Sequence, residues 1–351
     1  MKVRNEILSI VAFIILLLST IYFLDRLFIP KWITNDDNSH SFITRGYYAE
    51  PKNTIDVLFL GNSDTYRGVS PMKIWEDYNI TSYSYVSAGQ RIWTCYYMLI
   101  EALKTQKPKI IFLNVDNFFF NNQSSTGNYK KVFDNMKLSK NKIDALTDKT
   151  FNFSYGKQAT MIMPILGYHS RYNELTKDDF KYALSDYYNP HKGMDITTVK
   201  KGYTKDYIYD SDKRAKLNDT NKKYIDLIVK TAKEEGIDIE FIWIPSPDSW
   251  KRERSNTVSD YAKENGIKFT DLNLNYKDFK LDFKEDTCDE GDHLNVYGAT
   301  KVSNYLGKYI NDNYKFDKHD EKLITRWNKD LETYKNDIKE LEKLGKWYKT
   351  M

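Results

Sequence analysis

An uncharged run of 18 residues, Ile7–Leu24, constrains this chain more than any other feature of its sequence. A helix rises about 1.5 Å per residue, so this run spans about 27 Å, enough to cross the hydrocarbon core of a bilayer. Lys2 and Arg4 precede the run, and basic residues stay on the cytoplasmic side. We therefore expect residues 1–28 to form a single-pass signal-anchor in the cell membrane. The N-terminus is then cytoplasmic and the rest of the chain is extracytoplasmic.

A cleaved signal peptide and a buried helix of a soluble protein are the alternatives to this anchor. The run is long for the apolar part of a signal peptide, and no small-x-small cleavage site follows Leu24. Both observations favour an uncleaved anchor over a cleaved signal.

The remaining sequence has the composition of a globular protein. Of the 351 residues, 41% are hydrophobic and 29% are charged, which excludes a disordered chain. The 53 basic and 49 acidic residues leave a net charge of +4, so a dedicated nucleic-acid binder is not expected. Two cysteines cannot form a disulfide framework or a four-cysteine zinc site. One disulfide between Cys95 and Cys288 stays possible.

Strand-like and helix-like segments alternate along two parts of the chain. Short apolar runs predict strands at residues 55–60, 83–86, 109–115 and 238–244, with a weaker fifth at 267–272. Helical patterns occupy residues 91–104, 224–235, 258–264 and 296–310. This alternation predicts an α/β fold with a parallel sheet in a domain over residues 54–315.

Three segments fall outside this alternation. Residues 29–53 are interpreted as a polar linker from the membrane. Residues 118–218 are rich in Tyr, Asn, Asp and Lys, and we expect a large insertion of helical hairpins and loops that covers one end of the sheet. The tail, residues 316–351, carries a narrow apolar stripe on a highly charged helix. This helix packs either on its own domain or on a partner. The stripe consists of Leu323, Trp327, Leu331, Tyr334, Ile338 and Leu341.

The segment Gly61-Asn62-Ser63-Asp64 directly follows the first predicted strand. Sites in open α/β sheets form beyond the carboxyl ends of the strands. Free backbone N–H groups at the start of the next turn would point at a developing oxyanion. Ser63 is thus a candidate nucleophile that needs a base. The alternative is that Asn62 or Ser63 only caps a helix.

The second candidate segment, residues 289–295, precedes the last predicted helix of the domain. A carboxylate one to four residues from His293 can hold one ring nitrogen while the other faces Ser63. A metal site is the competing interpretation, because Asp and His are ligands of hard ions. No second His lies at ligand spacing nearby. Asp292 could also be a simple capping residue.

Together these segments resemble the SGNH (GDSL-like) hydrolase superfamily. The resemblance covers roughly residues 54–115 and 220–310, and it implies a three-layer α/β/α, flavodoxin-like parallel sheet. The matching blocks are Gly61–Gly68, Ser87-Ala88-Gly89-Gln90 after the second strand, and Asp289–Gly298. The family's third block, Gly-x-Asn-Asp, is absent, and Val115-Asp116-Asn117 stands at the corresponding strand end.

The resemblance implies a role for each matching residue. Ser63 is the nucleophile and His293 the general base, and no metal or cofactor is implied. The family places its Asp three residues before the His, where this chain has Glu290. Asp289 is our first choice for the orienting acid, Asp292 the second and Glu290 the third. The oxyanion hole would combine the backbone N–H groups of Ser63 and Gly89 with the amide of Asn117, or of its rival Asn114.

The anchor and the segment Pro164–Tyr172 are also similar to DltD-type surface-polysaccharide acyl-transfer proteins of Gram-positive bacteria. This likeness implies that His169 and Arg171 line the substrate cleft, with a buried His and a salt-bridged Arg as the alternative. Arg67, in the first SGNH block, is a further candidate for substrate binding. The likeness also implies a membrane-bound O-acyltransferase as partner, and a cell-surface polysaccharide or teichoic acid as acceptor of an acetyl or D-alanyl group. Ester hydrolysis by the same triad and a non-catalytic carbohydrate-binding scaffold are the alternatives.

Overall fold

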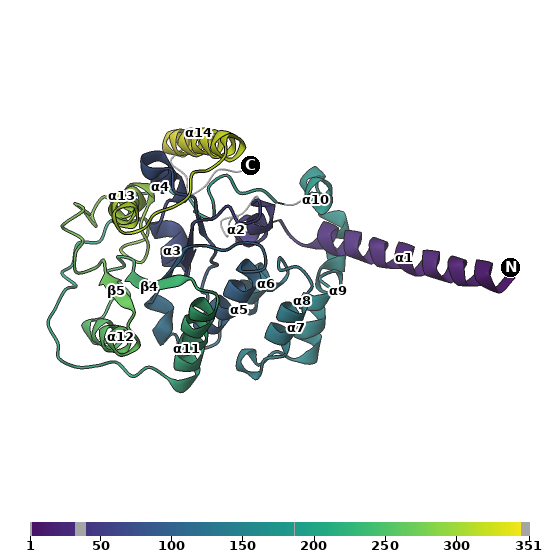
Figure 1. Ribbon diagram of the computed structural model, residues 1–351, viewed down its shortest axis with the longest axis horizontal. Coiled ribbons are helices and arrows are strands. Elements are labelled where there is room, and N and C mark those ends of the chain that lie inside the picture. The colour runs from purple at the N-terminus through teal and green to yellow at the C-terminus, as the bar shows by residue number, and fades with distance from the viewer. Residues whose placement is uncertain (1, 32–39, 186, 345–351) are drawn as a thin grey trace.

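The computed structural model describes residues 2–31, 40–185 and 187–344 and shows a helix-flanked sheet from which one long helix projects (Figure 1). All five strands are parallel, in the order β2-β1-β3-β4-β5. This is the flavodoxin-like order, so the predicted fold class is confirmed. The strands are β1 Val57–Leu60, β2 Ser82–Ser84, β3 Ile110–Asn114, β4 Asp238–Trp243 and β5 Lys268–Asp271.

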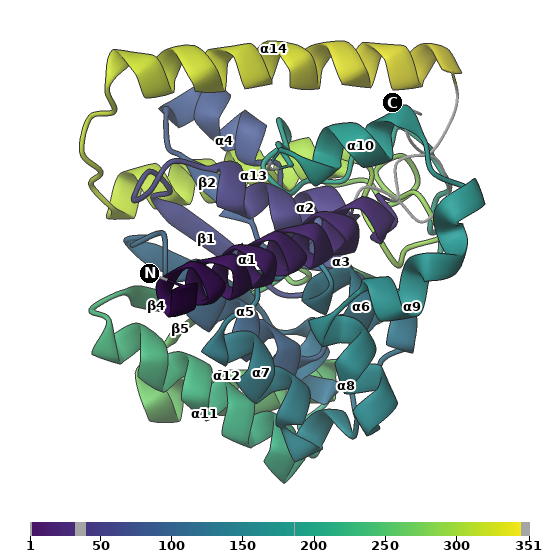
Figure 2. The same ribbon diagram turned by 90° about the vertical axis from the view of Figure 1, so that its right-hand side faces the viewer.

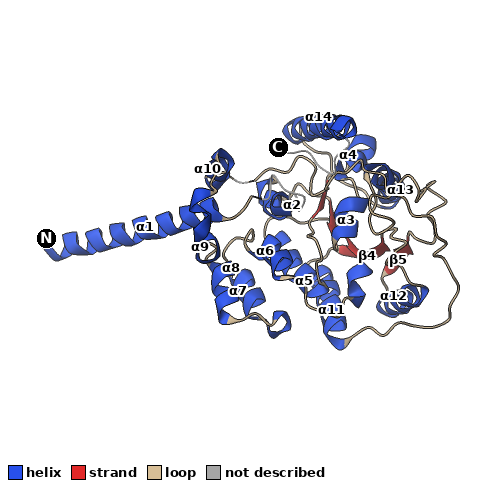
Figure 3. Cartoon of the chain, turned by 180° about the vertical axis from the view of Figure 1, so that it is seen from behind, coloured by secondary structure: helices blue, strands red, loops and turns tan. Residues whose placement is uncertain are grey.

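The central strands are apolar throughout because helices cover both faces of the sheet (Figure 3). Every residue of β1 and β3 is buried, as expected for a parallel sheet. Alternate residues serve different cores: Leu58 and Leu60 join the larger apolar cluster, whereas Phe59 joins the smaller one. Phe59 lies opposite Phe112 in β3, and their rings stack with centroids 5.5 Å apart.

The helices that follow the strands form the two outer layers. Apolar residues of α5, α11 and α12 belong to the larger cluster, and α13 supplies most of its apolar residues to the smaller one. The short helix α3 starts immediately after β1 and Gly61-Asn62. These helices are α3 Ser63–Gly68, α4 Pro71–Tyr78, α5 Ile92–Ala102, α11 Asp219–Glu234, α12 Arg252–Asn265 and α13 Val296–Asn313.

The projecting helix, α1 (Lys2–Phe28), contains the uncharged run. Its segment Val3–Phe28 is long and apolar enough to cross a membrane, with a mean hydropathy of 2.8 over its most apolar window. None of that window is buried against the protein. Side chains become partly covered only from Ile21 onward.

The segment interpreted as a linker is in part folded onto the domain, which corrects that interpretation. Helix α2 (His40–Gly46) and the 3₁₀ turn η1 (Tyr47–Ala49) lie within it. Ile43 and Tyr47 are completely or almost completely buried. The carbonyl of Ile43 accepts a hydrogen bond of 2.8 Å from the Tyr83 hydroxyl. These buried apolar side chains explain why residues 40–50 pack on the sheet layer; residues 32–39 of the predicted linker lie outside the described residues.

The insertion is helical as predicted, but most of it does not cover an end of the sheet. Its helices contact α5, α2 and the end of α1 (Figure 2). Its first and last parts reach the carboxyl edge. Ser124 donates to the carbonyl of Gly89, Asp195 N–H donates to the carbonyl of Tyr66, and Val296 N–H donates to that of Thr197. The helices are α6 Thr126–Phe133, α7 Lys140–Thr147, α8 Tyr155–Ile162, α9 Ile165–Tyr168 and α10 Lys177–Ala183, with turns η2 Asp116–Phe119, η3 Lys149–Phe151 and η4 His169–Asn173.

Both cysteines are buried as free thiols, so the possible Cys95–Cys288 disulfide is absent. Cys95 lies on α5 and its thiol faces the carbonyl of Gly61, whereas Cys288 lies on the loop before α13.

Of the two alternatives for the C-terminal helix, α14 (Glu321–Leu344) packs on its own domain. Its apolar stripe covers α4, and Trp327 is completely buried. The ring centroids of Trp75, on α4, and Trp327 are 5.2 Å apart. The indole N–H of Trp75 donates a hydrogen bond of 3.0 Å to the side-chain oxygen of Asn328. Ser70 donates to the Tyr334 hydroxyl.

One buried cation holds α14 to the rest of the domain. The ammonium of Lys192 is fully buried and lies 2.8 Å from Glu50 and 2.8 Å from Asp330 of α14. It also lies over the ring of Trp327 at 4.8 Å. Loss of one partner of such a group leaves uncompensated charge in the interior.

We expect Lys192→Met to lower the free energy of unfolding by about 3–5 kcal/mol, because buried Asp330 loses its cation and buried Glu50 keeps only its longer contact with Arg326. Denaturant unfolding of the full chain in detergent would measure it. Lys200→Met is the matched control, since Lys200 forms an exposed ion pair with Glu285 and should change stability little. Equal effects of the two variants would contradict this account.

Candidate active site

The candidate site lies at the carboxyl edge of the sheet, at the switch point between β1 and β3. Gly61 has φ of +152°, and a Cβ there would lie 2.3 Å from the Thr65 hydroxyl oxygen. This close turn places Ser63 as the first residue of α3. Ser63 is half-buried, and its hydroxyl has no hydrogen-bond partner among the described residues.

His293 lies on the loop before α13, and Asp289 fixes its ring. The two oxygens of the Asp289 carboxylate bind the His293 backbone N–H and the ring Nδ1, each at 2.6 Å. Glu290 and Gly291 both adopt positive φ, 65° and 100°, which turns the loop back on itself. The contact predicted between Asp289 and His293 is therefore present.

The other two acids of this loop are placed less well to orient the imidazole. Asp292 lies 3.3 Å from Nδ1 and its side chain is about half exposed. Glu290 points to solvent and pairs with Lys201.

The pKa values of the two nearer acids also differ. Burial raises the pKa of Asp289, but its hydrogen bond and charge interaction with His293 outweigh this, so the pKa lies below its usual value. Burial raises the pKa of Asp292 above its usual value. Asp289 is thus the more acidic of the two carboxyl groups beside the ring.

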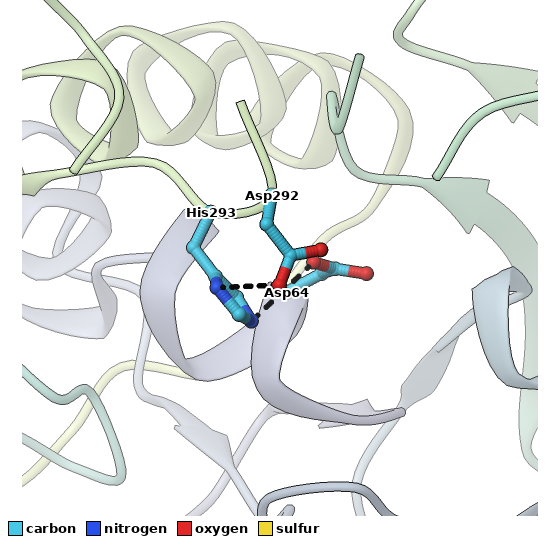
Figure 4. Close-up of side chains that lie close together, drawn as sticks. All are labelled: Asp64, Asp292 and His293. Atoms are coloured by element: carbon cyan, nitrogen blue, oxygen red, sulfur yellow. Dashed lines mark ion pairs between the residues drawn. The ribbon is translucent and has the colours of Figure 1, made fainter. Parts of the chain in front are cut away.

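The second ring nitrogen of His293 is directed at the first turn of α3. Nε2 lies 3.9 Å from Oδ1 of Asp64, the residue directly after Ser63 (Figure 4). No Ser63–His293 hydrogen bond is present within the described chain, which differs from the contact that the sequence predicts. Such bonds are often long without substrate and tighten when it binds.

The sequence pattern does not reveal a buried pair of carboxyl groups at this edge, Asp64 and Asp116. Asp116 follows β3 by two residues and accepts hydrogen bonds from Asn62 at 2.8 Å and Ser249 at 3.1 Å. Burial, with Asp116 alongside, raises the pKa of Asp64 well above its usual range. Burial also raises the pKa of Asp116. We interpret the pair as sharing one proton, held mainly by Asp64, because two adjacent buried carboxylates cannot both ionise.

The positions of Asp116 and Ser249 in the sequence could have identified them as candidate site residues. Each follows the end of a central strand, β3 for Asp116 and β4 for Ser249, and carboxyl ends of parallel strands meet at one edge. Their side-chain contacts, however, depend on how two distant loops meet.

The predicted oxyanion hole is only partly assembled. Gly89 is half-buried after β2 with φ of +58°, and the backbone N–H groups of Ser63 and Gly89 remain candidates. Asn117 is a correction: its amide is buried and donates to the carbonyl of Gln90 and the thiol of Cys95. The amide of the rival Asn114 is also buried and donates to the side-chain oxygen of Asn62.

The structure places the three predicted substrate-binding residues in contacts within the protein, and their role in substrate binding stays a prediction. Arg67 is buried and pairs with Asp195 at 2.9 Å. Arg171 donates to the carbonyl of Phe28 at the base of α1. His169 is exposed in the same turn as Arg171, with its ring against the carbonyl of Leu166.

Asp64, Asp292 and His293 form a group that sequence spacing did not reveal. One ligand atom from each lies within 4.8 Å of the others, so the group could hold a metal ion. The two carboxylates contact opposite ring nitrogens, however, Asp64 at Nε2 and Asp292 at Nδ1 (Figure 4). We therefore interpret the group as an ordered histidine rather than a metal centre.

The comparisons with known proteins leave the function to the geometry. No protein-family model matches the sequence, and no curated protein matches it. A proposed acylhydrolase from Bacteroides fragilis is similar in structure over 79% of this chain and 98% of its own, at 13% identity and a TM-score of 0.37. A GDSL-like lipase from Bacteroides thetaiotaomicron is similar over 76% and 95%, at 12% identity and a TM-score of 0.37. Likenesses this distant do not assign an activity.

We expect Asp289→Asn to lower the rate of acyl transfer or ester hydrolysis by about 10²–10⁴-fold, because the imidazole loses its orienting charge. Asp292→Asn should lower it by less than about tenfold, since that side chain is half exposed and more distant. Steady-state kinetics on a soluble ester would compare them. The opposite order would move the orienting role to Asp292.

Dialysis against a chelator should leave both the thermal midpoint and ester hydrolysis unchanged. The reason is that the carboxylates near His293 contact different ring nitrogens, Asp64 at Nε2 and Asp292 at Nδ1. A loss that zinc or calcium restores would reassign the group as a metal centre.

Proposed function

We propose that this chain is an extracytoplasmic, membrane-anchored acyl-transfer enzyme of the SGNH type. Ser63 is the nucleophile, His293 the general base and Asp289 the orienting acid. The observation that carries this proposal is how the two ring nitrogens of His293 are placed. Asp289 binds one ring nitrogen, and the other is directed at the turn that begins with Ser63. Nucleophile, base and orienting acid in this order constitute a serine triad.

The reaction proceeds in two half-reactions. Ser63 Oγ attacks the acyl carbon of the donor while His293 Nε2 takes the hydroxyl proton. The backbone N–H groups of Ser63 and Gly89 stabilise the tetrahedral oxyanion. Collapse breaks the bond to the donor oxygen, which takes the proton from His293, and leaves acyl-Ser63. An acceptor hydroxyl then gives its proton to His293 and attacks the acyl carbon. The bond between that carbon and Ser63 Oγ breaks, and His293 returns the proton to Oγ.

The acceptor is a hydroxyl of a cell-surface polysaccharide or teichoic acid, and the group moved is acetyl or D-alanyl. An anchor of the length of α1 would keep the enzyme beside the membrane on which such polymers are built. A membrane-bound O-acyltransferase partner would deliver the acyl group. Ester hydrolysis is the second candidate, because Ser63 is only half-buried and water can replace the sugar hydroxyl.

A fluorophosphonate probe on the full chain tests the nucleophile. Wild type should be labelled, and Ser63→Ala should not, because the probe reacts with an activated serine hydroxyl. Ser249→Ala is the matched control: Ser249 is the other serine that contacts a carboxylate at this edge, and its loss should leave labelling in place. Absence of labelling in wild type would favour the non-catalytic scaffold.

The same preparation distinguishes transfer from hydrolysis. Mass spectrometry follows acyl-Ser63 formed from an activated ester, with and without a glycan acceptor. A transferase passes the acyl group to the glycan in preference to water, whereas an esterase releases it as acid in both cases.

A further inference from the structure

The base of α1 is clamped by the insertion rather than joined to it by a flexible tether. Asp25 accepts a hydrogen bond of 2.9 Å from the backbone N–H of Ile165, at the start of α9. Arg171 of η4 donates to the carbonyl of Phe28 at 2.6 Å. Arg26 donates to the carbonyl of Tyr182 on α10. Three elements of the insertion therefore fix the direction in which α1 leaves the protein.

A buried lysine completes this clamp. Lys31 donates to the carbonyl of Ile29 at 2.7 Å and lies 3.7 Å from the buried carboxylate of Asp179. Asp179 also pairs with Arg171 and caps the start of α10 through Thr176. The contacts of α1 with the domain thus continue beyond its last turn.

The exposed part of α1 has the length of a bilayer core. Side chains from Val3 to Thr20 are exposed, which corresponds to about 27 Å of helix. Coverage by the protein begins at Ile21. If α1 spans the membrane, the outer boundary of the hydrocarbon core falls where α9 and α10 meet the helix.

Large apolar side chains gather on the elements at this level. Of the described residues outside α1, seven large apolar side chains are at least half exposed, and six of them lie between residues 138 and 184. Leu184 is 80% exposed and Tyr172 is 73% exposed. Such a concentration is unusual for a surface that faces only water. Five of them lie on or beside the elements that contact α1 and are called the apolar collar here: Leu138, Leu166, Tyr172, Phe180 and Leu184.

The figures place these elements around the exit of α1. In Figure 1, α8, α9 and α10 lie at the end of the body from which α1 projects. Figure 2 looks along α1 and shows α9 and α10 to one side of it. A plane across α1 at its base would therefore meet the collar.

We infer that the apolar collar inserts into the lipid surface of the membrane that α1 crosses. This inference rests on the proposed membrane anchoring. The collar continues the lipid-facing surface of α1, and tyrosine is enriched at membrane–water interfaces. Residues 118–185 carry ten Lys or Arg against six Asp or Glu, which suits anionic phospholipid headgroups.

A small cavity beside the base of α1 is also lined by more basic than acidic side chains. It has a volume of about 230 Å³ and lies between α1 and the insertion. Its lining includes four basic and two acidic side chains: Arg26, Arg45, Lys137, Lys142, Asp25 and Asp134.

Depth-dependent quenching on the full chain in phosphatidylglycerol–phosphatidylcholine liposomes tests the inference. Leu184→Cys and Phe180→Cys are labelled with a polarity-sensitive fluorophore, and the unsubstituted protein is the blank because both native thiols are buried. Leu16→Cys in α1 reports the bilayer core. Glu264→Cys is the matched exposed control on α12, which Figure 1 shows at the other end of the body.

Phospholipids spin-labelled near the headgroup should quench positions 184 and 180 at least twofold more than position 264. Position 16 should be quenched best by lipids labelled deep in the acyl chain. If 184 and 180 behave like 264 while 16 is quenched, the collar inference is wrong and anchoring stands. If 16 is not quenched, anchoring and collar both fail. Shielding of 184 and 180 in native membranes but not in pure lipid would identify a protein as the occupant and overturn the inference.

Discussion

The parallel pairing of β1 with β3, buried on both faces, is the constraint on which the rest of the structure depends. Because both strands run in the same direction, the chain leaves β1 and β3 at the same edge of the sheet. One exit becomes the Gly61 turn and α3 with Ser63 and Asp64; the other becomes η2 with Asp116. The His293 loop only has to reach this edge. Residues more than 50 and more than 170 positions apart are thereby brought together.

The cost of burying two carboxyl groups at this edge explains their surroundings. An ionised carboxylate out of water is strongly unfavourable unless it is paired and hydrogen-bonded. Asp116 receives hydrogen bonds from Asn62 and Ser249, and Asp64 avoids ionisation by keeping its proton. A neutral Asp64 leaves Asp289 as the charge that orients His293. Buried acids held in different protonation states are typical of sites that move protons.

Most of the sheet could be predicted from the sequence, because short, continuous apolar runs such as Ile110–Leu113 are typical of strands buried on both faces. Ser63 and His293 were found because each directly adjoins a recognisable strand or helix. The contacts of Asn117 with Cys95 and of Arg171 with Phe28 could not be predicted, because these partners lie far away in sequence or in a different element. Residues 29–53 were interpreted as a linker because the segment is polar overall, although its apolar residues Ile43 and Tyr47 are buried. Local patterns thus predicted elements, whereas side-chain directions depended on tertiary contacts.

The insertion and the supposed linker together connect the anchor helix to the sheet. Helix α2 bridges them: Thr44 and Arg45 donate to the carbonyls of Lys131 and Asn135 on and after α6, and Ile43 receives the Tyr83 hydroxyl from β2. Arg171 continues this connection to the end of α1. Each step is a hydrogen bond between packed elements, so the carboxyl edge of the sheet keeps one orientation relative to α1. Under the proposed membrane anchoring, this orientation would fix the side from which the carboxyl edge of the sheet faces the membrane surface.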